Sequence, residues 1–272
     1  MILVTGATGK VGRNVVGELL RAGARVRAVS RSPERAGLPA EVEVVRGDLA
    51  APPPLDGVEK IFLFPGETDL RPFADAARAA GVRHVALLSS SVPGYDRPNP
   101  ISDAHLAHEH AVAEAGLPYT FVRPGGFMAN DLTWAETIRA ENVVRSPYGD
   151  AGTALIDERD IAAVIVGALL DDAHIGQAYT LTGPQSLTVK QRVDILGQAL
   201  GRELRFEHQS PEAFAIDMAG FAKPEFVDAM LDFGAFFDGK AGPVFPTVAQ
   251  VTGRPAHTYA QWAAHHAAEF RA

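Results

Sequence analysis

Residues 5–12 read TGATGKVG and lie between a short apolar run, residues 1–4, and an amphipathic run, residues 11–20. This order predicts a strand, a glycine turn and a helix. The first glycine of such a turn adopts backbone angles that a side chain disfavours, the second lets a pyrophosphate approach the main chain, and the third lets the helix pack on the strand. Free amides at the start of the helix face an anion, so the stretch predicts a dinucleotide-binding loop. Its expected cofactor-binding residues are Gly6, Ala7, Thr8, Gly9, Lys10, Val11 and Gly12.

Strand-like and helix-like runs alternate through the first half of the chain. The predicted strands are Ile2–Thr5, Arg25–Ser30, Val42–Arg46, Lys60–Phe64, His84–Ser89 and Thr120–Arg123. The predicted helices are Val11–Arg21, Leu70–Ala80, Ser102–Ala115 and Asp157–Leu170. Strands that alternate with helices indicate an α/β fold, here a Rossmann-type doubly wound parallel sheet with helices on both faces.

The pattern becomes less regular from residue 126. We expect residues 1–125 to form a dinucleotide-binding Rossmann core and residues 126–272 to be a mixed segment. Within that segment, the helix Asp157–Leu170 and a neighbouring strand return to the core, and the remainder forms a smaller carboxyl-terminal substrate lobe. The pattern also predicts helices near residues 129–140 and 188–200, with short strands near Val143 and Tyr179. The lobe should cap the carboxyl ends of the strands, where open parallel sheets bind their ligands.

Composition narrows the class of protein. The chain has 272 residues, a formal net charge of −8 and no cysteine. An acidic chain lacks the basic face that nucleic-acid phosphates require, so we expect no nucleic-acid partner. Without cysteine there is no disulfide or thiolate-bound metal, which is typical of cytoplasmic proteins and leaves redox chemistry to a bound cofactor. No apolar run reaches the roughly 18 to 20 residues that span a membrane, so we expect a cytoplasmic protein without a membrane partner.

The end of the second predicted strand bears on which nicotinamide cofactor binds. An acidic residue there favours the ribose hydroxyl of NAD, whereas an arginine suits the additional phosphate of NADP. The strand ends in Ser30 and Arg31, with Arg35 four residues later and no carboxylate at the strand end, so NADP(H) is expected over NAD(H). Alternatively, both arginines are ordinary solvated charges on a loop. Asp48, followed by Leu49, either contacts the adenine or caps the next turn.

These residues, together with later motifs, resemble the NmrA-like branch of the atypical short-chain dehydrogenases/reductases. The motifs follow predicted strands four, five and six: Phe64-Pro65, Ser89-Ser90 and Arg123-Pro124-Gly125-Gly126-Phe127. Residues 179–183 and 253–255 continue the likeness, which therefore spans nearly the whole chain. Within the branch the chain is most similar to bacterial NADPH-dependent quinone reductase-like and azoreductase-like proteins. The resemblance implies that the motif residues lie along the cofactor.

The better-known members of this superfamily donate a proton from a tyrosine that is assisted by a lysine four residues later. When the helix after strand five is matched to theirs, Leu106 takes the tyrosine position and His110 takes the lysine position. A general acid of the usual type is therefore absent. Reduction of an unactivated ketone needs a positioned proton donor, whereas quinones, azo compounds and conjugated enones spread the incoming charge. The missing pair therefore points to such electron-poor acceptors.

Three residues are candidates for catalysis: His105, His110 and Ser90. The spacing of His105 and Glu109 places both on one helix face, as a donor with its orienting carboxylate. The alternative is a polar helix edge with no catalytic role, and the serines after strand five could simply terminate the strand. A zinc site from His105, His108 and Glu109 would need a further ligand that the sequence does not supply, so no metal is expected.

The first hypothesis is an NADPH-dependent oxidoreductase that transfers hydride to a quinone-like, azo or conjugated enone acceptor. Two alternatives stay open: an NADP(H)-binding redox sensor without turnover, and a biosynthetic cyclase or isomerase on the same fold. The partner would be a small aromatic or conjugated substrate, and an oligomer is possible. Large apolar residues of the lobe suit a flat substrate, although most of them should be core. They are Phe127, Met128, Trp134, Phe214, Phe221, Phe226, Met230, Phe233, Phe236 and Phe237.

Overall fold

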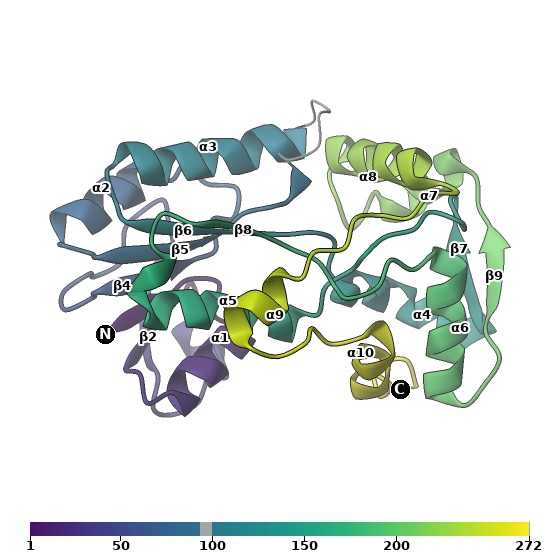
Figure 1. Ribbon diagram of the computed structural model, residues 1–272, viewed down its shortest axis with the longest axis horizontal. Coiled ribbons are helices and arrows are strands. Elements are labelled where there is room, and N and C mark those ends of the chain that lie inside the picture. Colours follow the sequence, from purple (N-terminus) through teal and green to yellow (C-terminus); the bar gives the residue numbers. More distant parts are fainter. Residues whose placement is uncertain (93–99, 272) are drawn as a thin grey trace.

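A seven-stranded parallel sheet forms the centre of the molecule (Figure 1). The computed structural model describes residues 1–92 and 100–271. The strand order is β3-β2-β1-β4-β5-β6-β8, and every neighbouring pair is parallel. The strands are β1 (Ile2–Val4), β2 (Val26–Ser30), β3 (Glu43–Arg46), β4 (Lys60–Leu63), β5 (His84–Leu88), β6 (Tyr119–Pro124) and β8 (Ala178–Leu181). The expected Rossmann-type fold is confirmed, and the order reverses direction between β1 and β4.

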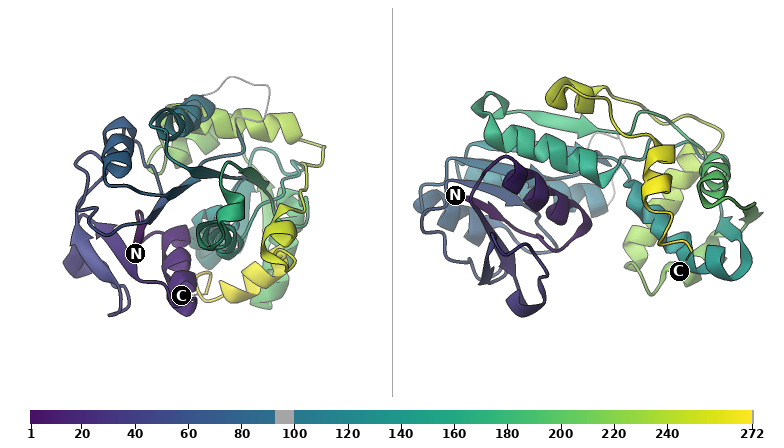
Figure 2. Two further views of the ribbon diagram at one scale, coloured as in Figure 1. Left: turned by 60° about the vertical axis from the view of Figure 1, so that its left-hand side comes forward. Right: turned by 90° about the horizontal axis from the view of Figure 1, so that it is seen from below.

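Helices cover both faces of this sheet (Figure 2). On one face α1 (Lys10–Arg21) packs against α5 (Glu158–Leu170), which in turn contacts α9 (Thr247–Thr252). On the other face lie α2 (Arg71–Ala79) and α3 (Pro100–Glu114). The strands are buried on both sides because parallel sheets bury their apolar side chains under helices on each face. Short turns of 3₁₀ helix follow β2 and α5, at η1 (Pro33–Arg35) and η4 (Asp172–His174).

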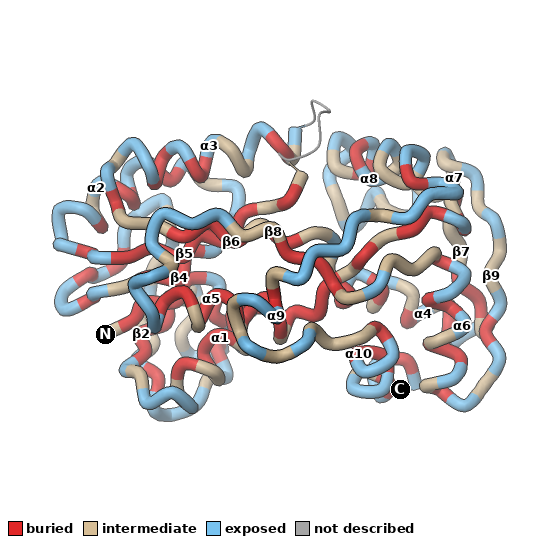
Figure 3. The backbone as a smooth tube through the Cα atoms, in the orientation of Figure 1, coloured by how far each residue is buried: buried red, intermediate tan, exposed pale blue. Residues whose placement is uncertain are grey.

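The remaining elements form a lobe beside the carboxyl ends of the strands, at the right of Figure 1. They are η3 (Met128–Trp134), α4 (Ala135–Glu141), β7 (Val143–Ser146), α6 (Val189–Leu200), β9 (Arg205–His208), α7 (Pro211–Met218), α8 (Pro224–Phe237) and α10 (Tyr259–His265). Strands β7 and β9 pair in parallel, apart from the large sheet. The lobe has its own apolar core around Trp262 and Phe270, visible as buried segments in Figure 3.

The chain passes back to the sheet after the first lobe elements. Helix α5 packs on α1, and β8 extends the sheet beside β6, although both follow η3, α4 and β7 in the sequence. The boundary expected at residue 125 stays a prediction.

Local signals explain where the lobe helices begin and end. Thr188 caps α6 through a reciprocal pair of hydrogen bonds with Gln191, and the helix ends at Gly201 in a left-handed conformation. The single helix expected near residues 129–140 is instead the 3₁₀ segment η3 followed by α4. No helix within residues 1–92 and 100–271 has both the length and the apolar character that a membrane crossing requires. The cytoplasmic location stays a prediction.

Candidate functional site

The glycine turn closes so tightly that side chains are excluded from it. Gly6 has a φ of +60°, which glycine tolerates. A Cβ on Gly12 would lie 2.1 Å from the Gly6 carbonyl oxygen, and one on Gly9 would lie 3.3 Å from the same atom. Helix α1 therefore starts in direct contact with the turn. The sequence-based roles of the first and third glycines follow from these distances.

The start of α1 offers unpaired amides to an anion. Gly9 is the N-cap and no side chain caps the helix in the described part of the chain. The first helical hydrogen bond runs from the Arg13 amide to the Gly9 carbonyl at 2.9 Å, which leaves the amides of residues 10–12 at the helix end. The Lys10 ammonium donates to the Ala129 carbonyl of η3 at 2.9 Å and so joins this turn to the lobe. These residues fit a pyrophosphate at the turn.

Phe64 and Pro65 lie beside the turn, where the strand order reverses. The Phe64 amide donates to the Thr5 hydroxyl at 2.7 Å, and a Cβ on Gly6 would lie 2.9 Å from the Phe64 Cβ. The Phe64 side chain is nevertheless 44% exposed, whereas Pro65 is buried. An exposed aromatic ring at this position provides an apolar surface next to the glycine turn.

The loop after β2 leaves two guanidinium groups exposed. Arg31 and Arg35 are exposed, and neither forms an ion pair within the described residues. Ser30 accepts a hydrogen bond from the Ser32 amide and so shapes the turn at the strand end. Asp48 accepts from the amides of Ala50 and Ala51 at 2.9 Å through one oxygen, Oδ1. Turn capping, one of its two predicted roles, is therefore observed; contact of Asp48 or Leu49 with an adenine stays a prediction.

A buried carboxylate joins the ends of β5 and β6. Glu109 of α3 accepts a hydrogen bond from the Ser89 hydroxyl at 2.6 Å. It also accepts from Nε of Arg123 at 2.8 Å and from its Nη2. The Glu109 side chain is 4% exposed and that of Arg123 is 30% exposed. The hydrogen bond with Glu109 raises the pKa of the Arg123 guanidinium, which therefore stays charged.

This arrangement corrects the pairing that helix spacing suggested. Glu109 shares a helix face with His105, but its oxygens bond to Ser89 and Arg123 instead. Sequence reasoning placed Ser89 and Arg123 along the cofactor and missed Glu109 as the group that links them. Sequence spacing shows which residues share a face of α3. The strands packed against that face determine which side chains lie close enough to bond with Glu109.

The three histidines of α3 have different surroundings. His105 is half-buried, its Nδ1 has no hydrogen-bond partner among the described residues, and burial lowers its pKa, so the ring is neutral at neutral pH. His108 is buried with Nε2 3.2 Å from the Thr68 carbonyl oxygen. His110 lies on the exposed face of the helix, where the structure does not bring it to the other candidates. No group of three or more His, Asp or Glu within residues 1–92 and 100–271 is arranged to hold a metal.

Main-chain hydrogen bonds join the segments that follow β5 and β6. The Ser91 amide donates to the Pro124 carbonyl, and the Gly125 amide donates to the Leu181 carbonyl, both at 2.9 Å. The half-buried Ser90 accepts a hydrogen bond from the Val92 amide at 3.2 Å. The Ile156 amide donates to the Gly126 carbonyl and the Met128 amide donates to the Ile156 carbonyl, both at 2.9 Å, in the connection that leads to α5. Backbone positions at this edge of the sheet are thereby fixed from several strands.

Helix α8 supplies an apolar wall beside this edge. It contacts α3 and lies next to the amino-terminal end of that helix (Figure 1). Met230 and Phe236 of α8 are largely exposed, as is Phe221 in the connection before it. Of the ten large apolar lobe residues, only Met128 and Phe237 are buried. Three more are exposed and the other five are half-buried, with Phe127 and Trp134 packed against the apolar cores, so the expectation that most of them are core stays a prediction.

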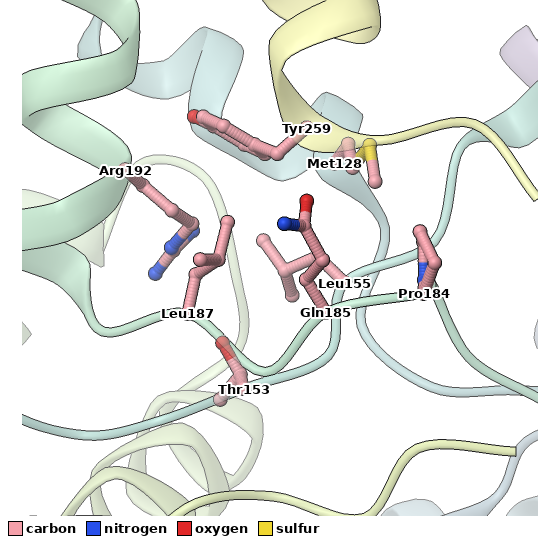
Figure 4. Close-up of a pocket in the computed structure, with 8 residues that line it drawn as sticks. All are labelled: Met128, Thr153, Leu155, Pro184, Gln185, Leu187, Arg192 and Tyr259. Carbon is pink, nitrogen blue, oxygen red and sulfur yellow. The ribbon is translucent and has the colours of Figure 1, made fainter.

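A small pocket inside the lobe is filled by the side chains that line it. Eight side chains line it, and the space between them has no room for a water molecule (Figure 4). Behind it, the buried Asp131 accepts hydrogen bonds from Arg192 at 2.5 Å and from the Tyr259 hydroxyl at 2.6 Å. These residues fix η3, α6 and α10 to each other, and sequence reasoning did not identify them because 61 or more residues separate the partners.

The glycine turn, the exposed arginines and the strand-end network all lie within the segment that a comparison with known families matches. A family model described as NAD(P)H-binding matches residues 6–172. The chain belongs to this NAD(P)H-binding family. A curated relative from Streptomyces griseus, "(4-alkanoyl-5-oxo-2,5-dihydrofuran-3-yl)methyl phosphate reductase", is 43% identical over 280 residues, 99% of each chain. The NAD(P)H azoreductase of Xenophilus azovorans is 38% identical over 286 residues, the full length of both chains.

A solved structure supports the same assignment. The NADPH-dependent quinone oxidoreductase of Escherichia coli, in complex with NADPH, aligns with a TM-score of 0.82 and 26% identity over 97% of this chain and 99% of that one. As a member of this family with such full-length relatives, the chain is an NAD(P)H-dependent oxidoreductase. The sequence-based expectations of a cofactor-dependent oxidoreductase and of likeness to quinone and azo reductases are confirmed.

Proposed function

We propose that this oxidoreductase uses NADPH to reduce the carbon–carbon double bond of a small conjugated carbonyl compound. The observation that carries the proposal is the strand-end network, where Ser89, Glu109 and Arg123 occupy the edge at which the superfamily places its proton-donating helix. Leu106 stands where a donating tyrosine would, so an acceptor that spreads the incoming charge is favoured. Quinones and azo compounds belong to the same electron-poor class.

The relative from Streptomyces griseus favours the enone among these acceptors. Its name describes a ring with a carbon–carbon double bond next to carbonyl groups. Bound NADPH would supply the hydride. The chain's own residues would position the reactants: residues 6–12 and the amides of 10–12 hold the phosphates, and α8 offers an apolar surface to the acceptor.

His105 is the proposed hydrogen-bond donor to the acceptor. Hydride addition to an enone leaves negative charge on the carbonyl oxygen, and a neutral imidazole can donate an N–H to it. The ring is half-buried near the amino-terminal end of α3, and its Nδ1 has no hydrogen-bond partner within residues 1–92 and 100–271. The exposed His110 sits on the same helix and serves as a matched control.

An acceptor panel tests the proposal. NADPH consumption would be followed with a cyclic enone, a quinone, an azo dye and a saturated ketone. We expect turnover of the first three and none of the ketone. His105→Gln should lower enone reduction by about 100-fold, the lower end for a lost hydrogen-bond donor to a developing oxyanion, whereas His110→Gln leaves it unchanged. Tight NADPH binding without turnover of any acceptor would overturn the proposal and favour the sensor alternative.

A further inference from the structure

Arg13 joins the glycine turn to the loop that carries the exposed arginines. Its Nε donates to the Thr8 carbonyl at 3.0 Å, within the turn. Its Nη1 and Nη2 donate to the carbonyls of Gly37 at 2.9 Å and Ala36 at 3.0 Å, just after η1. All three guanidinium nitrogens therefore bond to main-chain oxygens, two of them 23 or 24 residues away in the sequence. Gly37 itself has a φ of +55°, so the chain turns sharply where Arg13 holds it.

Four arginines surround this loop, and the structure divides them into two pairs. Arg46 of β3 donates to the Arg31 carbonyl at 2.6 Å and forms an ion pair with Glu34, so its charge is compensated. Arg13 also bonds to the main chain, but within the described residues no carboxylate pairs with it. The guanidinium groups of Arg31 and Arg35 form neither a main-chain hydrogen bond nor an ion pair among those residues. Two arginines thus build the loop, and two remain for a ligand.

We infer that Arg13 is a positioning residue for selectivity between NADPH and NADH. It holds the loop of Arg31 and Arg35 at a fixed distance from the turn that binds the pyrophosphate. The spacing between these two sites must match the spacing of phosphates across one adenosine ribose, because a misplaced guanidinium loses its charge-assisted bonds. This inference rests on the proposed use of NADPH. It predicts that loss of Arg13 weakens binding of the ribose phosphate more than it weakens binding of the rest of the nucleotide.

The test compares two small probes by calorimetry, 2′,5′-ADP and 5′-AMP, which differ by the ribose phosphate. Arg13→Gln should weaken 2′,5′-ADP about tenfold and 5′-AMP less than about twofold. Arg13→Lys should restore little of the loss, because one ammonium group cannot span three carbonyls. Arg21→Gln removes the same charge from the far end of α1, where Arg21 pairs with Glu18, and should leave both affinities within about twofold of the wild type.

The possible outcomes separate this inference from the proposed function. Equal weakening of both probes by Arg13→Gln, or full recovery with Arg13→Lys, would overturn the positioning role while wild-type selectivity stays intact. Equal affinity of the wild type for both probes would overturn the NADPH preference itself. Urea unfolding without ligand checks that each variant is folded. If Arg13→Gln does not fold, the affinities of Arg13→Lys for the two probes decide the question. A ratio of these two affinities equal to that of the wild type would then count against the inference.

Discussion

Substitution of Gly12 by alanine should move α1 away from the glycine turn. The added Cβ would lie 2.1 Å from the Gly6 carbonyl oxygen, 2.7 Å from its carbon and 2.9 Å from the Ala7 Cα. All three are backbone atoms, so no side-chain rotation relieves the contact. Restoring an ordinary separation requires a shift of about 1 Å, and overpacking of this kind costs about 3 kcal/mol, the upper end of its usual range.

The same helix contains a matched control. Gly17 lies in the middle of α1, and a Cβ there would meet only the Arg21 guanidinium at 3.8 Å. Gly17→Ala should therefore stabilise the protein by about 0.5 to 1 kcal/mol, because alanine loses less conformational freedom in a helix than glycine does.

Two measurements check the pair of variants. Urea unfolding gives the free energy of unfolding, and NADPH fluorescence gives the dissociation constant. Gly12→Ala should lower the free energy of unfolding by about 3 kcal/mol. It should also raise the dissociation constant of NADPH at least about tenfold, because the amides of residues 10–12 move with the helix. Wild-type stability together with wild-type NADPH affinity in Gly12→Ala would refute the reasoning that the helix start binds the pyrophosphate.

Three further predictions concern buried ionisable groups. Burial lowers the pKa of His84 from 6.5 to about 4, so the stability due to its neutral form is present above pH 6.5 and is lost as the pH falls towards 4. The free energy of unfolding in urea should therefore fall by up to about 3 kcal/mol over this range in the wild type, and His84→Gln should remove this fall. The hydrogen bond with Glu158 raises the pKa of His266, so the stability that the charged ring contributes is full below pH 6.5 and is lost as the pH rises through the raised pKa. The free energy of unfolding of the wild type should exceed that of His266→Gln by about 1 kcal/mol at about pH 6, and this difference should shrink as the pH rises. Glu109→Gln leaves the Arg123 guanidinium without its carboxylate and should cost about 2 kcal/mol in thermal unfolding, less than for a fully buried pair because Arg123 reaches solvent; an unchanged midpoint would contradict the charged pair.

The sheet was predictable from sequence to within a residue or two at most strand ends. Its strands are nearly continuous apolar runs, and runs of that kind are typical of strands buried on both faces. Strand β9 was not predicted, because its sequence Arg-Phe-Glu-His contains one apolar residue and the strand pairs only with β7. Its pairing depends on the lobe having already formed around it.

The candidate site was predictable where one local motif encodes it. The glycine turn is such a motif, since its geometry arises within a few residues. The network of Glu109 with Arg123 is different: the carboxylate comes from a helix and the guanidinium from the neighbouring strand, 14 residues later. Asp131 and Tyr259 are 128 residues apart. No spacing rule connects such pairs, because the fold brings them together only after the elements pack.

The chain passes between the sheet and the lobe several times, and this limits how related proteins of this fold can come to prefer different acceptors. The lobe consists of three separate stretches, residues 128–146, 189–237 and 259–265, and α5, β8 and α9 lie between them. It cannot be exchanged as a single cassette by one recombination event, because any graft would have to replace all three stretches together. New acceptor preferences in this architecture should therefore arise by point substitutions on a shared frame, and chimaeras built at a single crossover should fail to fold.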